Sequence, residues 1–229
     1  MTETPETPGA PEAPTGPPGG AQPPAAPPPA APPTAVGPAA DYPVHLDVER
    51  QEEYSRFMPL IKWLLAIPHY IALLVLGIGA VIVAIISFFA VLFTGRYPEG
   101  MFNYMVGVHR WGVRVGAYVL LMVDPYPPFT LDDDPSYPAS FDIDYPEHVE
   151  RWRPLLTWLL VIPYAIVSYL ITLVASVCSL IAFFTILFTK KIPDGLFDVI
   201  RISLNWQNRA SFYLYYLSTE YPPFEWDDE

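Results

Sequence analysis

The sequence predicts an all-α fold: a polytopic membrane protein with two tandem helical-hairpin repeats behind a disordered tail. Two observations predict the membrane helices. Apolar residues make up 52% of the chain and charged residues only 16%. No Asp, Glu, Lys or Arg occurs between Lys62 and Arg96 or between Arg153 and Lys190. Each of these gaps exceeds the roughly 20 apolar residues that cross a bilayer core. A third observation, an internal repeat, gives the number of units.

The predicted tail covers residues 1–41. Residues 1–40 contain 14 of the 29 prolines and are charged only at Glu3, Glu6 and Glu12. Such a segment buries too little apolar surface to offset the entropy of ordering, so we expect an extended, disordered arm. The alternative is a docking site for a proline-recognising protein. The tail lacks the basic and apolar regions of a signal peptide, so the first apolar segment is expected to direct insertion.

Two copies of one unit follow the tail, at residues 42–134 and 135–229. A shift of 95 positions aligns residues 42–134 with 137–229 without a gap. Chance hydrophobic similarity would match Leu and Val, whereas this alignment matches prolines, tryptophans and arginines, so the sequence contains a duplication. The matched residues include Arg56 with Arg151, Pro59 with Pro154, Trp63 with Trp158, Pro68 with Pro163, Trp111 with Trp206, and Arg114 with Arg209.

Each copy is predicted to contain three helical pieces. In the first copy, residues 56–68 form a short amphipathic helix at the lipid headgroups, and residues 69–93 form an apolar helix long enough to span a bilayer with some tilt. Pro68 marks their junction, because proline removes a backbone donor and kinks or restarts a helix. After a Gly/Pro turn, a third helix covers residues 101–122, and its counterpart covers residues 196–217.

The third helix is ambiguous, because it is apolar overall but carries a polar stripe at helical spacing. An arginine near the bilayer centre costs at least about 2.5–3.5 kcal/mol. This helix therefore either spans with its stripe turned inward or lies in the interface with its arginines among headgroups. The stripe contains Asn103, Gly107, Arg110 and Arg114 in the first copy, and Asp198, Arg201, Asn205 and Arg209 in the second.

We expect the third helix to span, because the copies resemble each other at both ends. Each begins with basic residues and ends in an acidic run, residues 132–134 and 227–229. This similarity predicts that the copies share one orientation, which requires an even number of crossings per copy. About four transmembrane helices plus short interfacial helices follow; two crossings plus interfacial helices are the alternative.

The balance of basic residues then predicts that both termini are cytoplasmic. Cytoplasmic segments near membrane helices carry an excess of Lys and Arg. In the four-helix arrangement five basic residues lie on the side of the tail and three on the side of the turns: Arg50, Arg56, Lys62, Arg151 and Arg153 against Arg96, Lys190 and Lys191.

Several local motifs of the chain resemble those of a known family. They are the run from Phe93 through Thr94-Gly95-Arg96-Tyr97-Pro98-Glu99-Gly100 to Phe102, then Arg110-Trp111 with Arg114 and Tyr118, then Tyr126-Pro127-Pro128-Phe129. Together these residues resemble the bacterial membrane proteins grouped as the domain of unknown function 4389 family, in the tandem form seen in actinobacteria. The resemblance covers about residues 42–229. It implies a helical membrane fold, and it transfers no catalytic residue because the family has no settled activity.

No pattern in the sequence predicts catalysis, a metal site or a cofactor. The four histidines, His45, His69, His109 and His148, show no metal-ligand spacing, and the single cysteine is Cys178 in the second apolar segment. Motifs for nucleotide binding or nucleophilic hydrolysis are missing. The formal net charge of −12 disfavours nucleic acid as a partner, because no basic surface would neutralise its phosphates.

The candidate functional residues are the stripe arginines and the tryptophans at equivalent positions beside them. Guanidinium groups bind phosphate oxygens bidentately, and indole prefers the membrane interface. These residues therefore predict a contact with anionic lipid or lipid phosphate. Alternatively, the arginines close the helix bundle by bonding helix-terminal carbonyls or acidic neighbours. The candidates are Arg110, Arg114, Arg201, Arg209, Trp111 and Trp206.

A second set of aromatic residues is predicted to anchor each copy at the water boundary. Prolines that stop the helix accompany most of them. The anchors are Trp63, Trp158, Tyr126, Phe129, Tyr221 and Phe224.

These expectations describe a non-enzymatic, multi-pass protein of the cell membrane that scaffolds a complex or contacts lipid in the cell envelope. The expected partners are membrane lipids, a protein bound to the proline-rich tail, or further copies of the chain. The alternative function is a small transporter or channel component that uses the interface between the two repeats.

Overall fold

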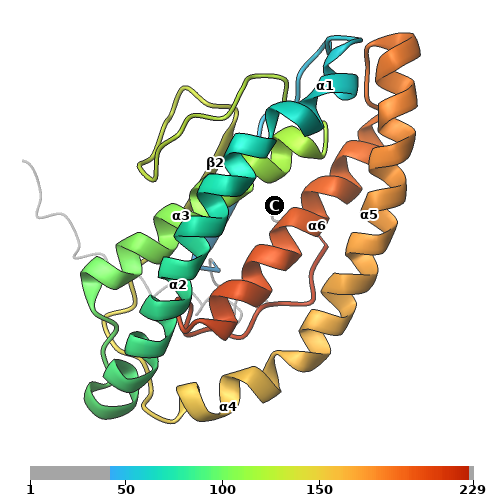
Figure 1. Ribbon diagram of the computed structural model, residues 1–229. Coiled ribbons are helices and arrows are strands. Elements are labelled where there is room, and N and C mark those ends of the chain that lie inside the picture. Colours follow the sequence, from blue (N-terminus) through green and yellow to red (C-terminus); the bar gives the residue numbers. More distant parts are fainter. Residues whose placement is uncertain (1–41, 227–229) are drawn as a thin grey trace, which may run out of the picture. The chain divides into compact units, whose positions relative to one another are not determined.

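The computed structural model describes residues 42–226, and helices dominate them (Figure 1). The predicted tail lies outside the described residues. Each copy contains one short strand followed by a short helix and two long helices, which confirms the three predicted helical pieces. The first copy comprises β1 (Val44–Val48), α1 (Met58–Leu65), α2 (Ile67–Thr94) and α3 (Glu99–Val119); the second comprises β2 (Ala139–Ile143), α4 (Arg153–Leu160), α5 (Ile162–Thr189) and α6 (Asp194–Leu214).

The junction between α1 and α2 lies two residues earlier than the prolines suggested. Ala66 separates the two helices and itself has helical backbone angles. Pro68 lies in the first turn of α2, where its missing N–H removes no intrahelical hydrogen bond. The same arrangement recurs in the second copy, where Val161 separates α4 from α5.

The strands β1 and β2 form an antiparallel two-stranded sheet that the all-α prediction missed. Leu46 lies opposite Phe141, and Val44 lies opposite Ile143. In both strands buried residues alternate with exposed ones, which is the period-two pattern of a half-buried strand. A five-residue run is a weak signal beside the long apolar helices, so the sequence interpretation assigned no strand.

The sheet relates the two copies by an approximate twofold axis. Leu46 and Phe141 are equivalent residues at the 95-residue offset, and each is the other's partner in the sheet. The flanking pairs obey the same symmetry, because Val44 and Ile143 exchange with Val48 and Ala139. Each strand packs on the last helix of the other copy, β1 on α6 and β2 on α3. The copies therefore exchange their N-terminal strands.

The two copies run in opposite directions, so the expectation that they share one direction was wrong. The N–H of Tyr54, before α1, donates to the carbonyl of Lys190 at the end of α5 over 2.8 Å. The N–H of Val149, before α4, donates to the carbonyl of Gly95 at the end of α2 over 2.9 Å. Each long helix thus begins beside the end of the other (Figure 1). The rotation that relates the two copies explains why their sequences are similar at both ends. This similarity therefore does not require an even number of membrane crossings per copy.

The grouping of basic residues by side changes for the same reason. Arg50 donates to the carbonyl of Ile192 and pairs with Asp194. A residue assigned to the tail side of the first copy therefore lies at the turn of the second. The contact of Val149 with Gly95 likewise joins the start of the second copy to the turn of the first. The count of five basic residues against three therefore combines residues from different ends of the molecule. It does not indicate which side of the membrane the termini occupy.

The buried core surrounds α3, α6 and the sheet, whereas α2 and α5 lie outside it and bury only one face each. The inward faces of α2 and α5 carry small or polar residues such as Ser87 and Ala175. The core residues of the inner elements include Phe102, Met105, Val113, Phe141, Ile200 and Phe212.

Candidate functional site

The polar stripe of α3 faces the acidic segment that follows this helix. The side chain of Arg114 is fully buried. Its guanidinium donates to the carbonyl of Thr130 at 3.4 Å and to that of Asp132 at 2.9 Å. A carboxylate oxygen of Asp133 lies 3.7 Å away. A buried charge is tolerated when it is paired and hydrogen-bonded, and these contacts pair the charge and bind both terminal nitrogens, whereas the buried Nε has no partner among the described residues.

Arg110, one helical turn earlier, joins α3 to the strand contributed by the other copy. Its Nε donates to the carbonyl of Phe141 at 2.9 Å, and its Nη2 donates to the carboxylate of Asp142 at 3.3 Å. A third bond, of 3.3 Å, reaches the carbonyl of Leu131. The arginine therefore connects the helix, the acidic segment and the exchanged strand.

The acidic segment reaches the stripe because Gly107 leaves room for it. A Cβ on Gly107 would lie 2.9 Å from the Cβ of Leu131, too close for any larger residue without movement. At the end of the segment, Asp134 accepts hydrogen bonds from the hydroxyl and N–H of Ser136. These bonds hold the pKa of the Asp134 carboxyl below its usual value, so the segment stays anionic beside the arginines.

In the second copy, Arg209 occupies the position equivalent to Arg114 and is also buried. Its guanidinium lies over the ring of Tyr42, 5.0 Å from the ring centre. Burial raises the pKa of Tyr42 to about 12, so this phenol is neutral near pH 7. Asn205, equivalent to Arg110, is buried as well, whereas Arg201 is half-buried. The contacts of Arg110 and Arg114 with carbonyls and acidic neighbours are of the kind that the bundle-closing alternative describes.

The two stripe tryptophans lie inside aromatic clusters at equivalent places. Trp111 donates from its indole N–H to Nδ1 of the buried His69 at 3.1 Å, and His69 stacks on Phe129 with ring centres 4.1 Å apart. In the second copy, Tyr164 replaces His69 and stacks on Trp206 at 4.6 Å. Each cluster packs the segment after α3 or α6 against the preceding apolar helix.

The six predicted anchors lie at the surface of the described residues. Trp63 and Trp158 are 63% and 58% exposed, and each indole N–H donates to a carbonyl three residues earlier in its own helix over 2.7 Å. The hydroxyls of Tyr126 and Tyr221 donate to the last carbonyls of α1 and α4, at 3.2 Å and 3.3 Å. The remaining anchors, Phe129 and Phe224, are 53% and 52% exposed.

Two buried cations were not among the predicted site residues. The ammonium of Lys62 donates to the carbonyl of Val123 at 2.7 Å, lies 2.8 Å from a carboxylate oxygen of Asp124, and is 5.0 Å from the ring centre of Tyr118. In the second copy, Arg153 bonds the carbonyl of Thr219, pairs with Glu150, and is 5.6 Å from the ring centre of Tyr213. Lys62 aligns with Thr157, and Arg153 aligns with Met58. Because the two cations stand at non-equivalent positions, the alignment of the copies does not reveal that both contact an equivalent tyrosine.

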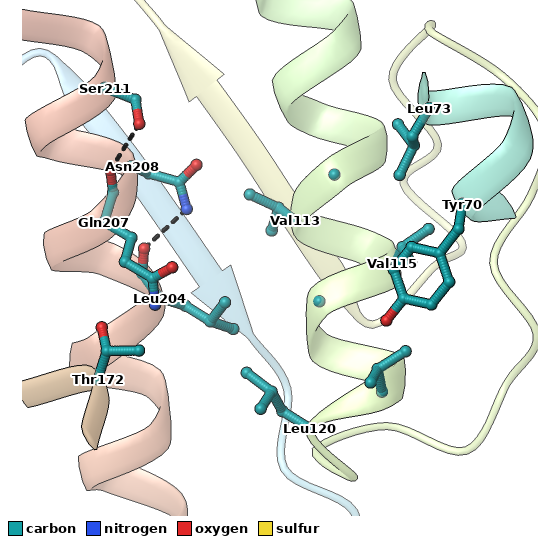
Figure 2. Close-up of a pocket in the computed structure, with 13 residues that line it drawn as sticks. Tyr70, Leu73, Val113, Val115, Leu120, Thr172, Leu204, Gln207, Asn208 and Ser211 are labelled. Atoms are coloured by element: carbon teal, nitrogen blue, oxygen red, sulfur yellow. Dashed lines mark hydrogen bonds between the residues drawn. The ribbon is translucent and has the colours of Figure 1, made fainter. Parts of the chain in front are cut away.

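A cavity of about 420 Å³ lies between the two copies (Figure 2). One wall is α3, with Gly112, Val113 and Gly116, and the opposite wall is α6, with Gln207, Asn208 and Ser211 (Figure 2). Tyr70 and Leu73 of α2 and Thr172 of α5 complete the lining. Gln207, Asn208 and Ser211 are aligned with Gly112, Val113 and Gly116 at the 95-residue offset. The cavity therefore follows the twofold relation between the copies, with a small apolar wall facing a polar one.

The family described as Domain of unknown function (DUF4389) matches the chain twice, at residues 59–130 and 151–225. The chain belongs to this family. Both matches together cover more than half of the chain, and their positions confirm the tandem arrangement. Each DUF4389 match begins after a strand, so both β1 and β2 lie outside the matched residues. No curated protein and no solved structure matches the chain.

The DUF4389 copies contain the arginine stripes, the aromatic clusters and the cavity walls, but they form no metal centre. Among residues 42–226, no three His, Cys, Asp or Glu side chains lie close enough together to hold a metal ion. Cys178 on α5 is partly buried and has no cysteine partner there. What the geometry offers chemically is charge pairing within the core, a wide apolar exterior, and one neutral cavity between the copies.

Proposed function

We propose that this DUF4389 protein is a non-enzymatic, lipid-contacting membrane protein that acts as a scaffold in the cell envelope. The observation that carries the proposal is the apolar exterior of α2 and α5. Both helices are long and apolar enough to cross a membrane. Each large apolar side chain transferred from water contributes roughly 1.5–3 kcal/mol. A lipid environment therefore stabilises the exposed face strongly. The exposed residues include Ile71, Leu74, Ile78, Ile82, Phe89 and Phe93 of α2, and Ile166, Leu170, Leu173, Val177, Leu180 and Phe188 of α5.

The distribution of polar groups supports a surface with two distinct faces. None of the strongly exposed large hydrophobic side chains of the described residues belongs to α3 or α6. The outer side of the sheet exposes polar residues instead: His45, Asp47, Ser140 and Asp142. Soluble proteins rarely expose contiguous apolar patches larger than a few hundred Å², so the apolar helices favour contact with lipid while the sheet favours water.

Two arrangements place the apolar helices in lipid. In the spanning arrangement, α2 and α5 cross the bilayer, either together with α3 and α6 as four crossings or alone with α3 and α6 in the interface. In the surface arrangement, α2 and α5 lie along the membrane with the sheet turned toward water. Asp47 and Asp142 favour the surface arrangement, because they flank the twofold axis at the middle of the molecule. Spanning helices would place these carboxylates at bilayer depth, at a cost of at least about 2.5 kcal/mol each.

Cysteine labelling separates these arrangements. Arg96 follows α2 and Lys191 follows α5, and both side chains are exposed. Because the copies are antiparallel, spanning helices place these residues on opposite sides of the membrane, whereas the surface arrangement places them on one side. Arg96→Cys and Lys191→Cys, each with Cys178→Ala, would be labelled with an impermeant maleimide in sealed vesicles. The control, Ile78→Cys, lies on the apolar face and should resist labelling.

Labelling of both turns from one side supports the surface arrangement, and labelling from opposite sides supports an arrangement in which α2 and α5 span. The lipid-contact proposal itself is tested by mixing detergent-purified protein with phosphatidylcholine vesicles, removing the detergent and floating the vesicles on a density gradient. We expect the protein to float with the vesicles. Recovery of folded protein in the lipid-free fraction would contradict lipid contact in either arrangement.

The scaffold role is tested through the tail, which lies outside the described residues. We expect full-length protein purified in mild detergent to retain a bound protein partner and a variant lacking residues 1–40 to lose it. Matching partner-free profiles for both proteins would count against a scaffold that uses the tail as its arm. Assembly of the chain with itself would show as a multiple of its mass in both forms.

A transporter or channel component is the second candidate, favoured by the antiparallel copies and the cavity between them. Inverted repeats with a binding site at their interface are a common plan of membrane transporters. Flux of ions and small solutes into liposomes tests this function. Gly112→Leu should block transport by filling the cavity, whereas Gly77→Leu should not. An impermeable wild-type protein would contradict this candidate.

A further inference from the structure

The cavity between the copies is chemically asymmetric although the copies are related by symmetry. Gly112, Val113 and Gly116 line its α3 side, and the aligned residues on α6 are Gln207, Asn208 and Ser211. Small residues on one wall leave the space, and polar residues on the other wall supply hydrogen-bonding groups (Figure 2). Packing of the two copies against each other does not by itself require a small wall on α3 and a polar wall on α6.

The amides of the polar wall present acceptors to the cavity. Nε2 of Gln207 donates to Oγ of Ser203 at 3.1 Å, and Nδ2 of Asn208 donates to the carbonyl of Leu204 at 2.7 Å. These bonds orient both amides and use one amide hydrogen of each. Within residues 42–226, neither side-chain oxygen accepts a hydrogen bond. Gln207 is exposed and Asn208 is half-buried, so both side-chain oxygens are accessible acceptors, and a ligand that donates a hydrogen bond fits this wall.

No charged side chain lines the cavity. An anionic or cationic headgroup would therefore enter without a counter-charge, which is unfavourable in a site of low polarity. The rest of the lining is apolar and includes Leu73, Val119 and Leu120. An uncharged group with a hydroxyl, attached to a hydrocarbon body, matches both parts of the lining.

The two apolar helices contribute to the lining of the cavity. Tyr70 and Leu73 belong to α2 and Thr172 to α5, and these two helices carry the exposed apolar faces. A hydrocarbon chain can leave the cavity between α2 and α5 and continue into lipid. The volume of about 420 Å³ is within the usual range for small-molecule sites and accommodates a glycerol-sized headgroup with the first part of its chains.

We propose that the cavity between α3 and α6 binds an uncharged lipid with a hydroxyl headgroup, of the diacylglycerol class. The hydroxyl donates to the side-chain oxygens of Gln207 or Asn208, and the acyl chains pass between α2 and α5. This inference rests on the proposed lipid contact of those helices. It adds a defined site and a selectivity for neutral over charged headgroups.

Native mass spectrometry of the full-length chain in mild detergent tests the site, with dioleoylglycerol and dioleoylphosphatidic acid as probes. Both probes have the same acyl chains and differ in charge. We expect one dioleoylglycerol per chain at saturation, and at least about tenfold weaker binding of the phosphatidic acid. Gln207→Leu with Asn208→Leu removes both hydrogen-bond acceptors and should weaken dioleoylglycerol binding by about tenfold or more.

Two glycine variants provide the matched pair. A Cβ on Gly112 or on Gly77 would meet no atom within 4 Å, so both sites have open space for leucine. Gly112 lines the cavity, whereas Gly77 does not. Gly112→Leu should abolish dioleoylglycerol binding, and Gly77→Leu should bind like the wild type. Thermal unfolding in the same detergent checks that both variants are folded.

Equal binding to all variants, equal binding of the two lipids, or no saturable binding would overturn the proposal; the last result indicates a cavity filled by water alone. The vesicle flotation experiment remains separate. Protein that floats with phosphatidylcholine but binds no dioleoylglycerol would contradict the neutral-lipid site and leave the lipid-contact function intact.

Discussion

At the scale of single residues, the two buried cations show how the copies keep one interaction while changing the residues that make it. Lys62 on α1 and Arg153 on α4 stand at non-equivalent positions, yet they reach the rings of the equivalent residues Tyr118 and Tyr213. Each also bonds a carbonyl in the turn that follows the third helix. The interaction ties the first helix of each copy to the end of the third.

Lys62→Thr, which introduces the residue found in the second copy, should destabilise the protein. Removing one partner of a buried ion pair typically costs about 3–5 kcal/mol; Asp124 retains 19% exposure, so we expect about 2–3 kcal/mol. Adding Met58→Arg to Lys62→Thr places the residue types of the second copy at both positions. The double variant should regain part of the lost stability. The free energy of unfolding in mixed detergent micelles measures both changes.

Arg56→Met is the matched control for this pair, because Arg56 is an exposed basic residue next to the same helix. We expect it to change the free energy of unfolding by less than about 0.5 kcal/mol. A Lys62→Thr protein as stable as the wild type would show that the buried ammonium contributes nothing net. A double variant no more stable than Lys62→Thr would show that the two cations are not interchangeable.

At the scale of elements, the ends of α2 and α5 share one geometry but not one residue type. Gly95 and Lys190 both have left-handed backbone angles, with φ of 70° and 61°. Glycine adopts this conformation without steric cost, whereas a residue with a Cβ is disfavoured by roughly 1 kcal/mol. Lys190 keeps a 3.8 Å ion pair with the exposed Glu53, and such pairs contribute little.

Lys190→Gly should therefore stabilise the protein by up to about 1 kcal/mol. The substitution reproduces the helix end of the first copy and retains the carbonyl that accepts from Tyr54. Lys191→Gly removes the same charge one residue later, where φ is not positive, and should give no gain. Unfolding in denaturant titrations compares the two variants. Equal effects of both would show that charge, not backbone conformation, decides this position.

The exchanged strands give the second prediction at this scale. His45 and Asp142 are exposed and lie directly opposite each other in the sheet. Opposite residues on antiparallel strands lie within the range that a disulfide requires. His45→Cys with Asp142→Cys, in a Cys178→Ala background, should form a disulfide on mild oxidation, detected as a mobility shift that a reductant reverses.

His45→Cys with Ser140→Cys is the control for the register, because Ser140 lies opposite Asp47, two positions away from the partner of His45. This pair should stay reduced under the same conditions. A disulfide in the control, or none in the matched pair, would contradict the register and with it the twofold relation between the copies.

At the scale of the whole molecule, strand exchange joins the copies more firmly than their position along the chain requires. Each copy contributes a strand and a backbone hydrogen bond to the other, through Tyr54 with Lys190 and Val149 with Gly95. Arg110 adds its bonds to the exchanged strand β2. The described residues 42–226 accordingly fold as one unit, not as two independent repeats.

Co-expressed fragments 1–135 and 136–229 should therefore assemble and co-purify through a tag on one of them. The cut falls in an exposed segment between Asp134 and Tyr137, outside both strands. Asp47→Pro in the first fragment should weaken the association, because the hydrogen bonds of Glu49 to Pro138 and of Asp144 to Pro43 place Asp47 among the ladder donors next to the twofold axis, and proline removes that donor. Fragments that purify separately in folded form would contradict mutual dependence of the copies.

The local features of this protein could be predicted from the sequence because they depend on near neighbours. The absence of charge across α2 and α5 predicts long apolar helices, and Pro68 and Gly95 lie close to their observed ends. The duplication is visible as fixed matches of Pro, Trp and Arg. For the candidate site, the sequence singled out Arg114 and Arg209 as an equivalent pair, and the structure places both in the core. It missed Lys62 and Arg153, because their common role is visible only where α1 and α4 meet the following turns.

The helices, the repeat and the apolar character of α2 and α5 follow from the sequence alone. The antiparallel relation of the copies, the pairing of β1 with β2, and the neutralisation of the α3 arginines by the acidic segment are visible only in the folded protein. The physical reason is that a repeated sequence specifies identical local structure in each copy but not the rotation that relates them. That rotation is set by contacts between residues about one repeat apart, such as Leu46 with Phe141.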